Sequence, residues 1–346
     1  MVNTKNTGLG LQQTKGNFQI IGKVVGVEKD RFYSELTTKS GKAMRIVNFG
    51  VEINPGQTVY VILNGMERDN VYFSCQNKDT KKTMVETVPW RERHSFNKPG
   101  FRIIGVNVGL EKIVNSKGES VNDKRNMTEF DACEYISEHL TDGMSVFIKG
   151  NVEYSTYNEK HQTKFVPSQI SLLSKPIDFD NAEYSVMSDF KQQIVLMGVN
   201  KHENGEDFVV SAKIVDYNSI EDAEFIIHKN RAALATALRK LKPYTAILVF
   251  GNIEVVNSVV TNTKDDDVWG KNPFTVSAPT IRQLVITGGE PDTIDTTIYN
   301  EKDMEEAIAR MNAKNQVKSD FADMNNDEDD VWGNGNKNDD IDDDWD

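Results

Sequence analysis

Cysteine is nearly absent from this sequence, and so are long hydrophobic runs. The two cysteines, Cys75 and Cys133, are too few and too widely separated for a disulfide framework or a zinc site. The longest apolar runs are short (AILVF at 246–250 lies in one), so no segment is expected to span a membrane. The N-terminal residues MVNTKNTGLG lack the apolar core of a signal peptide. Together these absences predict a cytoplasmic protein with reduced thiols and no membrane contact.

Motifs of common enzyme classes are missing as well. The sequence has no P-loop, no GxGxxG opening a helix and no HExxH. Its 5 histidines are scattered, and none stands beside a cysteine or carboxylate cluster at metal-ligand spacing. The aspartates near the C-terminus lie in a segment that we expect to be disordered, whereas a cation site needs converging rigid ligands. We therefore expect no enzymatic activity, no cofactor and no metal.

Charge is unevenly distributed along the chain. The formal net charge is −13, but residues 319–346 alone hold 12 acidic residues and one lysine. Residues 1–98 hold 15 basic and 9 acidic residues. A basic head and an acidic tail indicate a polyanionic partner at one end and a cationic partner at the other. A soluble protein with a merely solvated tail is the alternative.

One sequence unit occurs three times. FQIIGKVVGVEK (18–29) and FRIIGVNVGLEK (101–112) are identical at most positions, and FKQQIVLMGVNK (190–201) is a more divergent copy. A second landmark follows each copy: TVYVILNGME (58–67), SVFIKGNVE (145–153) and AILVFGNIE (246–254) are β-type runs that reach a glycine. Glycines at such places are typical of bends or bulges in a closing sheet. The three glycines are Gly65, Gly150 and Gly251.

The units also share the order of their remaining elements. Residues 131–140 and 230–243 have helical patterns, whereas the first unit has only GVEINPGQ at this point, with no room for a helix. A last strand is expected at 70–76, 164–173 and 273–287. Five strands with a helix between the third and fourth is the order of the OB fold, a small Greek-key barrel.

The predicted fold is therefore mainly β, with three tandem OB-fold-like five-stranded barrels, a short C-terminal helix and a disordered acidic tail. The expected domains are a flexible N-terminus (1–16), barrel one with a basic aromatic linker (17–98), barrel two (99–187), barrel three (188–290), a helical linker (291–318) and the tail (319–346).

CEYISEHLTDGMSVFIKGNVEY (133–154) is similar to the helix–strand–glycine stretch of single-stranded-DNA-binding proteins. The whole chain resembles a tandem-OB single-stranded-DNA-binding protein with an acidic tail, of the kind found in large bacteriophages. The resemblance implies sequence-independent binding and protection of single-stranded DNA in replication, recombination and repair, in the host cytoplasm if phage-encoded. It also leaves self-association possible. A non-enzymatic scaffold of a replication or virion complex and an RNA-binding OB protein are the alternatives.

The segment RFYSELTTKSGKAMRIVNFG (31–50) mixes rings and cations where an OB fold binds a strand. If the face of Met44 and Ile46 is the core, strand alternation places the intervening side chains on the outer surface. Packing of the rings of Tyr33 and Phe49 inside the barrel is the alternative. The candidate nucleic-acid-binding residues of this unit are Arg31, Tyr33, Lys39, Lys42 and Arg45.

Two further segments alternate rings with cations. In VPWRERHSFNKPG (88–100) the alternative is that Trp90 and Phe96 pack between barrels. The loop EYSTYNEKHQTKF (153–165) is expected to bind, whereas the matching third loop (257–274) carries three aspartates that would repel phosphate and favour weak binding or assembly. The candidates from the first two segments are Trp90, Arg91, Arg93, Lys98, Tyr154, Tyr157, Lys160 and Lys164.

The tail combines aspartates with tryptophans and is too charged to fold. Aspartates would attract a basic partner and an indole would be the buried anchor. Bacterial single-stranded-DNA-binding proteins resemble it in an acidic tip that docks on replication and repair proteins and competes with DNA at low salt. This tail ends differently, in Trp-Asp instead of Pro-Phe, so its partner stays open, and a pure solubility tail is the alternative. The candidate partner-binding residues are Asp329, Asp330, Trp332, Asp342, Asp343, Asp344 and Trp345.

Overall fold

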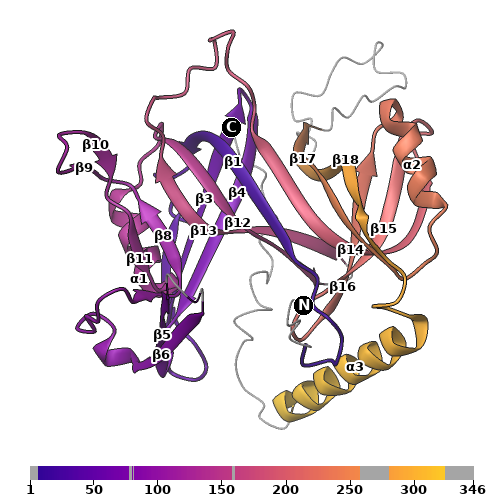
Figure 1. The fold of residues 1–346 in the computed structure, drawn as a ribbon, viewed down its shortest axis with the longest axis horizontal. Helices are drawn as coiled ribbons and strands as arrows, with labels where there is room; N and C mark the ends of the chain where they lie inside the picture. The colour runs from indigo at the N-terminus through magenta and orange to yellow at the C-terminus, as the bar shows by residue number, and fades with distance from the viewer. Residues whose placement is uncertain (1–6, 78–79, 81, 158–159, 258–279, 324–346) are drawn as a thin grey trace, which may run out of the picture.

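The computed structural model describes residues 7–77, 80, 82–157, 160–257 and 280–323. This part of the chain is mainly β, as the sequence predicts, and a 13-stranded sheet runs through it. The sheet curls into two barrels that lie side by side (Figure 1). No helix in these residues is long and apolar enough to cross a membrane.

Barrel 1 is a closed circuit of five strands. β1 pairs with β3, β3 with β4, β4 with β13, β13 with β12, and β12 returns to β1. The β4–β13 pair is parallel, and α1 lies between β4 and β12 in the chain. This is the strand and helix order of an OB fold. Its elements are β1 (Gly16–Val25), β2 (Tyr33–Thr37), which extends β3, β3 (Ala43–Asn54), β4 (Gln57–Met66), α1 (Glu129–His139), β12 (Ser145–Tyr157) and β13 (Lys160–Leu172).

An insertion separates β4 from α1. Its three-stranded sheet β6–β5–β7 has a small core of its own, where Phe73 packs on Phe96 with ring centroids 4.4 Å apart. β8 and β11 extend the barrel sheet beside β13, and the β9–β10 hairpin projects away (Figure 1, left). The elements are β5 (Asn70–Gln76), β6 (Thr83–Pro89), η1 (Trp90–Glu92), β7 (Arg102–Ile103), β8 (Val106–Gly109), β9 (Lys112–Val114), β10 (Ser120–Asn122) and β11 (Arg125–Met127).

Barrel 2 repeats the same circuit without an insertion. β14 pairs with β15, β15 with β16, β16 in parallel with β18, β18 with β17, and β17 with β14. α2 again lies between the third and fourth strands. The elements are β14 (Ser188–Lys201), β15 (Phe208–Val215), β16 (Ile220–Ile227), η2 (Lys229–Arg231), α2 (Ala232–Arg239), β17 (Thr245–Asn257) and β18 (Thr280–Asp295).

The two barrels join through their first strands. β1 and β14 pair antiparallel, and Phe18 stands directly opposite Phe190 in the register. Both rings are buried, Phe18 against Phe165 and Phe190 against Phe225, in one core cluster that spans both barrels. The junction is therefore continuous sheet and continuous core, which makes the two barrels one packed body.

The three-barrel prediction is wrong for the described residues, and the missing helix of the first unit explains why. Residues 58–67 form the third strand of barrel 1, and the second unit supplies its helix and last two strands. The middle repeat copy (101–112) falls in the insertion, where it breaks into β7, β8 and the start of β9. The first and third copies are β1 and β14, the equivalent strands of the two barrels.

The three landmark glycines do not share one structural role. Gly150 and Gly251 lie at register shifts opposite Phe18 and Phe190, and a Cβ on either would lie within 2 Å of a backbone oxygen. Both are bulges, as predicted. Gly65 is different, because a Cβ there would lie 2.1 Å from the backbone nitrogen of Phe130. It allows α1 to pack closely on β4.

Both ends of the described chain pack on barrel 2. Leu9 and Leu11 are buried with Val195, Tyr299 and Met304 in a separate core cluster. The helix expected at 301–316 is part of α3 (Glu301–Asp323), which lies below barrel 2 in Figure 1. Residues 7–14 are thus ordered against the barrel, contrary to the prediction of a flexible N-terminus through residue 16.

Candidate nucleic-acid interface

Of the two residues that the sequence assigned to the core of barrel 1, Met44 is buried outside the main core cluster, whereas Ile46 is only partly buried on the outward side of β3. Val47 and Phe49 point inward and are buried, which confirms barrel packing for Phe49. The outward side chains of β2, β3 and β4 form a half-exposed surface, which we call the β2–β4 face. It includes Leu36, Ile46, Asn48, Tyr60, Ile62 and Met66.

Arg45 therefore points toward α1 and away from the outer surface. Its Nη1 and Nη2 donate to Glu134 at 2.9 and 3.0 Å, and its Nε donates to Glu35 at 3.0 Å. Its guanidinium lies 4.0 Å from the ring centroid of Phe130. Two carboxylates and a ring hold this cation between β3 and α1, so it does not face a ligand.

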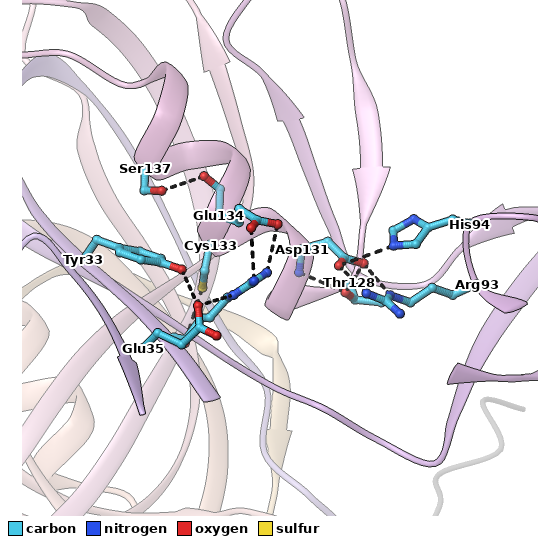
Figure 2. Close-up of polar contacts among 10 residues, drawn as sticks. Tyr33, Glu35, Arg93, His94, Thr128, Asp131, Cys133, Glu134 and Ser137 are labelled. Atoms are coloured by element: carbon cyan, nitrogen blue, oxygen red, sulfur yellow. Dashed lines mark hydrogen bonds and ion pairs between the residues drawn. The ribbon is translucent and has the colours of Figure 1, made fainter. Parts of the chain in front are cut away.

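Tyr33 lies on the same side as Arg45. Its hydroxyl donates to Glu35 at 3.0 Å, as Figure 2 shows, and its ring packs partly on the core. Burial, together with the hydrogen bond to Glu35, raises the pKa of Tyr33 to about 12. The structure thus corrects the placement of Tyr33 and Arg45 on a shared outer surface.

The other cations of this segment stay at the surface. Arg31 and Lys39 are exposed, and Lys39 lies in the β2–β3 turn. Lys42 follows the turn and pairs with Asp69 at 3.0 Å. The turn therefore places positive charge at one end of the β2–β4 face.

The linker candidates belong to the insertion. Trp90 is half-buried, with its ring 5.8 Å from Phe130 on one side and the Arg93 guanidinium 4.2 Å away on another. Arg93 donates to both oxygens of Asp131 at 2.9 Å, on the opposite side of α1 from Tyr33 (Figure 2). These contacts cover the rings, so Trp90 packs against α1 instead of standing free in a linker.

Arg91 and Lys98 remain exposed. Lys98 pairs with Glu86, and its ammonium lies 4.8 Å from the ring centroid of Phe101. A cleft of about 960 Å³ opens nearby, between the insertion sheet and α1. Its charged lining is mixed in sign: Arg93, His94, Arg102, Lys124, Arg125, Asp131, Glu134 and Glu138.

The four candidate residues of the β12–β13 hairpin have different surroundings. Tyr154 is turned into the protein, with its ring 6.3 Å from that of Phe225 and its hydroxyl buried, which corrects its expected exposure. Tyr157 and Lys160 pair across the end of the hairpin, and their side chains lie outside the described part of the structure. Lys164 lines a groove between the two barrels.

This junction groove has a volume of about 320 Å³ and lies between β13 of barrel 1 and β17–β18 of barrel 2. Its lining includes two cationic side chains, Lys164 and Arg282, and the imidazole of His161. No carboxylate belongs to the described lining. The Arg282 guanidinium lies 4.5 Å from the ring centroid of Tyr60, at the end of the β2–β4 face opposite the Lys39 turn. Glu153, the cross-strand partner of Lys164, interacts with its charge but does not line the groove. A concave site whose lining carries cations favours an anionic ligand.

Sequence reasoning missed Arg282 and did not include His161 among the candidate residues. Nothing in the local sequence indicates that β18 approaches β4, because this contact depends on the β1–β14 junction. The only available signal was the arginine in a strand otherwise rich in aliphatic residues.

The candidate partner-binding residues Asp329, Asp330, Trp332, Asp342, Asp343, Asp344 and Trp345 all lie outside the described residues. The same holds for the aspartates of the third loop, residues 265–267.

Comparison with known proteins gives a family and a set of distant structures. No curated protein matches the chain. A deletion mutant of the single-stranded DNA binding protein from Thermus aquaticus has 12% identity and a TM-score of 0.38, over 80% of this chain and 94% of that chain. The wild-type protein has 10% identity and the same TM-score, over 80% and 93%. The model of the YorF family matches residues 75–323, which is more than half of the sequence, and the chain therefore belongs to the YorF family.

Proposed function

We propose that this protein binds single-stranded DNA without sequence preference. The observation that carries the proposal is the junction groove, where Lys164, Arg282 and His161 meet with no carboxylate in the described lining. Phosphates of an unpaired strand need such cations, and their bases need apolar or aromatic surface beside them. Tyr60 and the half-exposed aliphatic side chains of the β2–β4 face supply that surface.

The proposed path crosses barrel 1 from the junction groove to the Lys39 turn. From Tyr60 to Met66, β4 spans roughly 20 Å at about 3.3 Å per residue. OB folds bind across their second and third strands, which here are β3 and β4. Lys39 and Lys42 are the proposed phosphate contacts at the far end, and Arg31, which precedes β2 at its other end, is a proposed contact along the way. Arg91 and Lys98 lie on the insertion and would meet a longer strand.

Lack of sequence preference follows from the kind of contact. Cations at phosphates and an apolar surface under bases carry little base-edge information. The biological role that we propose is protection of unwound strands in replication, recombination and repair, as in the bacteriophage proteins that the chain resembles. The cytoplasm of the host is the corresponding location.

We propose in addition that the acidic tail recruits replication or recombination proteins. Its tryptophans would enter apolar pockets while its aspartates meet basic rims. The sequence supports this role because two aspartate-flanked tryptophans are more than solubility requires. A pull-down with a peptide of residues 327–346, against one in which Trp332 and Trp345 are alanine, tests it: equal recovery of partners by both peptides would contradict the anchor role.

The binding proposal is tested by fluorescence anisotropy of a labelled oligo(dT) with the full chain. Arg282→Ala should weaken binding by roughly 1–2 kcal/mol, because a charge-assisted contact is lost from a partly open site. Lys240→Ala is the matched control, since Lys240 is an exposed cation at the end of α2 and does not line the groove. Equal affinities for all three proteins would contradict the proposed path.

Competition with other nucleic acids separates the alternatives. Unlabelled oligo(dT) should displace the probe far better than duplex DNA or oligo(U) of equal length. Preferential displacement by oligo(U) would identify an RNA-binding protein. Absence of any binding at low salt would favour the scaffold.

A further inference from the structure

The insertion sheet β6–β5–β7 turns one face to solvent. Its other face holds the small core around Phe73, so strand alternation sends the intervening side chains outward. Tyr72 is 46% exposed on the central strand, and Val85 and Ile104 are exposed on either side of it. We call this surface the insertion face, and it consists of Tyr72, Ser74, Gln76, Thr83, Val85, Thr87, Arg102 and Ile104.

The register of the strands places an aromatic ring in the middle of this face. Tyr72 stands opposite Thr87 on one side, and on the other side its carbonyl accepts from the backbone N–H of Ile104 at 2.8 Å. In the next row, Ser74 stands opposite Arg102. The face therefore presents one exposed ring among short or apolar side chains, with a cation one row away.

The charge of the insertion face is positive. None of its eight side chains is acidic, and Glu86 stands opposite Phe73, on the core side of the sheet. Arg102 is exposed on the edge strand, where it also borders the cleft beside α1. Lys82 is exposed in the connection between β5 and β6. Cations without carboxylates favour a phosphate chain, and an exposed ring beside them favours a base.

The insertion face begins where the β2–β4 face ends. β4 ends at Met66 and β5 starts at Asn70, only a few residues later. Lys42, which follows the β2–β3 turn, pairs with the carboxylate of Asp69 at 3.0 Å. Tyr72 comes three residues after Asp69, so roughly 10 Å of extended chain at most separates the two. A strand that leaves the Lys39 turn therefore reaches Tyr72.

Both faces also turn away from the same helix. The ring of Phe130 on α1 contacts Arg45 on the inner side of β3, with the guanidinium 4.0 Å from the ring centroid. The same ring lies 5.8 Å from that of Trp90, which packs against the core side of the insertion sheet. Because α1 covers the inner side of each sheet, the β2–β4 face and the insertion face are the sides left open to one strand.

We propose that the insertion face is a second base-stacking surface for this strand, with Tyr72 as the stacking ring and Arg102 and Lys82 as phosphate contacts. The inference rests on the proposed binding of single-stranded DNA, and it gives a role to the insertion that barrel 2 lacks. Beyond the Lys39 turn the strand would follow β5, which spans roughly 20 Å at about 3.3 Å per residue. Stacking on tyrosine tolerates any base, so the second surface adds affinity without sequence preference.

Anisotropy of two labelled oligo(dT) probes with the full chain tests the proposal. One probe has about 8 nucleotides, within the range of a single OB fold, and the other has about 30. Tyr72→Ala should weaken binding of the longer probe roughly five- to a hundredfold, because one stacked base is lost, and should affect the shorter probe far less. Tyr72→Phe keeps the ring and should bind like the wild type. Tyr217→Ala is the matched control, since Tyr217 is 58% exposed in the β15–β16 turn of barrel 2.

Urea unfolding of each variant shows that the fold is retained. Equal affinities of the wild type and Tyr72→Ala for the longer probe would overturn the inference. An equal loss for both probes would overturn it as well, because Tyr72 would then belong to the principal site. A loss in Arg282→Ala without a loss in Tyr72→Ala would overturn the inference alone, whereas a wild type that binds neither probe would overturn the proposed function with it.

Discussion

Replacement of Arg45 by methionine should destabilise the fold and leave single-strand affinity unchanged. Arg45 is a cation in a segment rich in candidate contacts, yet its side chain is only 13% exposed and lies between β3 and α1. Methionine keeps much of the unbranched stem and removes the charge. The variant therefore separates the structural contacts of this arginine from any contact with a phosphate.

The expected loss follows from the contacts of the guanidinium. Its position over Phe130, 4.0 Å from the ring centroid, corresponds to about 0.5–2 kcal/mol. The pair with Glu134, a half-exposed carboxylate, contributes roughly 0.5–1 kcal/mol after screening by water. Glu35 adds one further contact, accepting a hydrogen bond from Nε at 3.0 Å. We expect the free energy of unfolding to fall by roughly 2 kcal/mol.

Urea unfolding and oligo(dT) anisotropy measure the two effects. Lys39→Ala is the opposite case, since Lys39 is exposed in the β2–β3 turn. It should keep the stability of the wild type and lose affinity, with the slope of log affinity against log salt reduced by about 0.7. Weaker binding by folded Arg45→Met, with unchanged stability, would show that our assignment of the inner and outer faces is reversed.

Three further predictions concern pH and the tail. Burial of Asp131 opposes its ionisation, but hydrogen bonds from Arg93 and Thr128 outweigh this effect and lower the pKa of Asp131 below 3.8. The stabilising contribution of Asp131 is therefore lost as pH falls through that lowered pKa. The variant Asp131→Asn should flatten the acid limb of a plot of urea stability against pH. Burial alone would lower the pKa of His228, but hydrogen bonds to Glu254 and Asp207 raise it above 6.5. The contribution of His228 to folding stability is therefore full below pH 6.5 and declines as pH rises through the pKa of the folded state. The variant His228→Gln should lack this decline. Truncation after Lys318 should strengthen oligo(dT) binding at low salt, since a competing polyanion is removed, and weaker binding would contradict that role of the tail.

The local elements were predictable because they depend on local pattern. The helix expected at 131–140 is found as α1. Its apolar side chains recur on one face, and Thr128 caps its N-terminus by accepting a hydrogen bond from the N–H of Asp131. Gly150 and Gly251 lie at bulges where a Cβ would come within 2 Å of a backbone oxygen of the neighbouring strand, so only glycine fits. The number of barrels was not predictable from repetition alone. The copy at 101–112 lies in an insertion, and β12 and β13, which follow it in the chain, close barrel 1 without it.

The interface was less predictable than the fold because its key contacts are long-range. Strand alternation correctly separates the two faces of β3, but only packing shows that Val47 and Phe49 are inside and that Arg45 can lie beside them. Arg45 is tolerated there because Glu134 approaches from a helix 89 residues away. Arg282 reaches Tyr60 only because the barrels join through β1 and β14.

The salt dependence of binding by a Lys164→Ala/Arg282→Ala double variant tests the central claim most directly. Both residues line the junction groove, and each is proposed to neutralise one phosphate. The slope of log affinity against log salt should be smaller than that of the wild type by about 1.4, at about 0.7 per contact. A slope equal to that of the wild type, in a variant of unchanged stability, would mean that single-stranded DNA does not pass between the barrels.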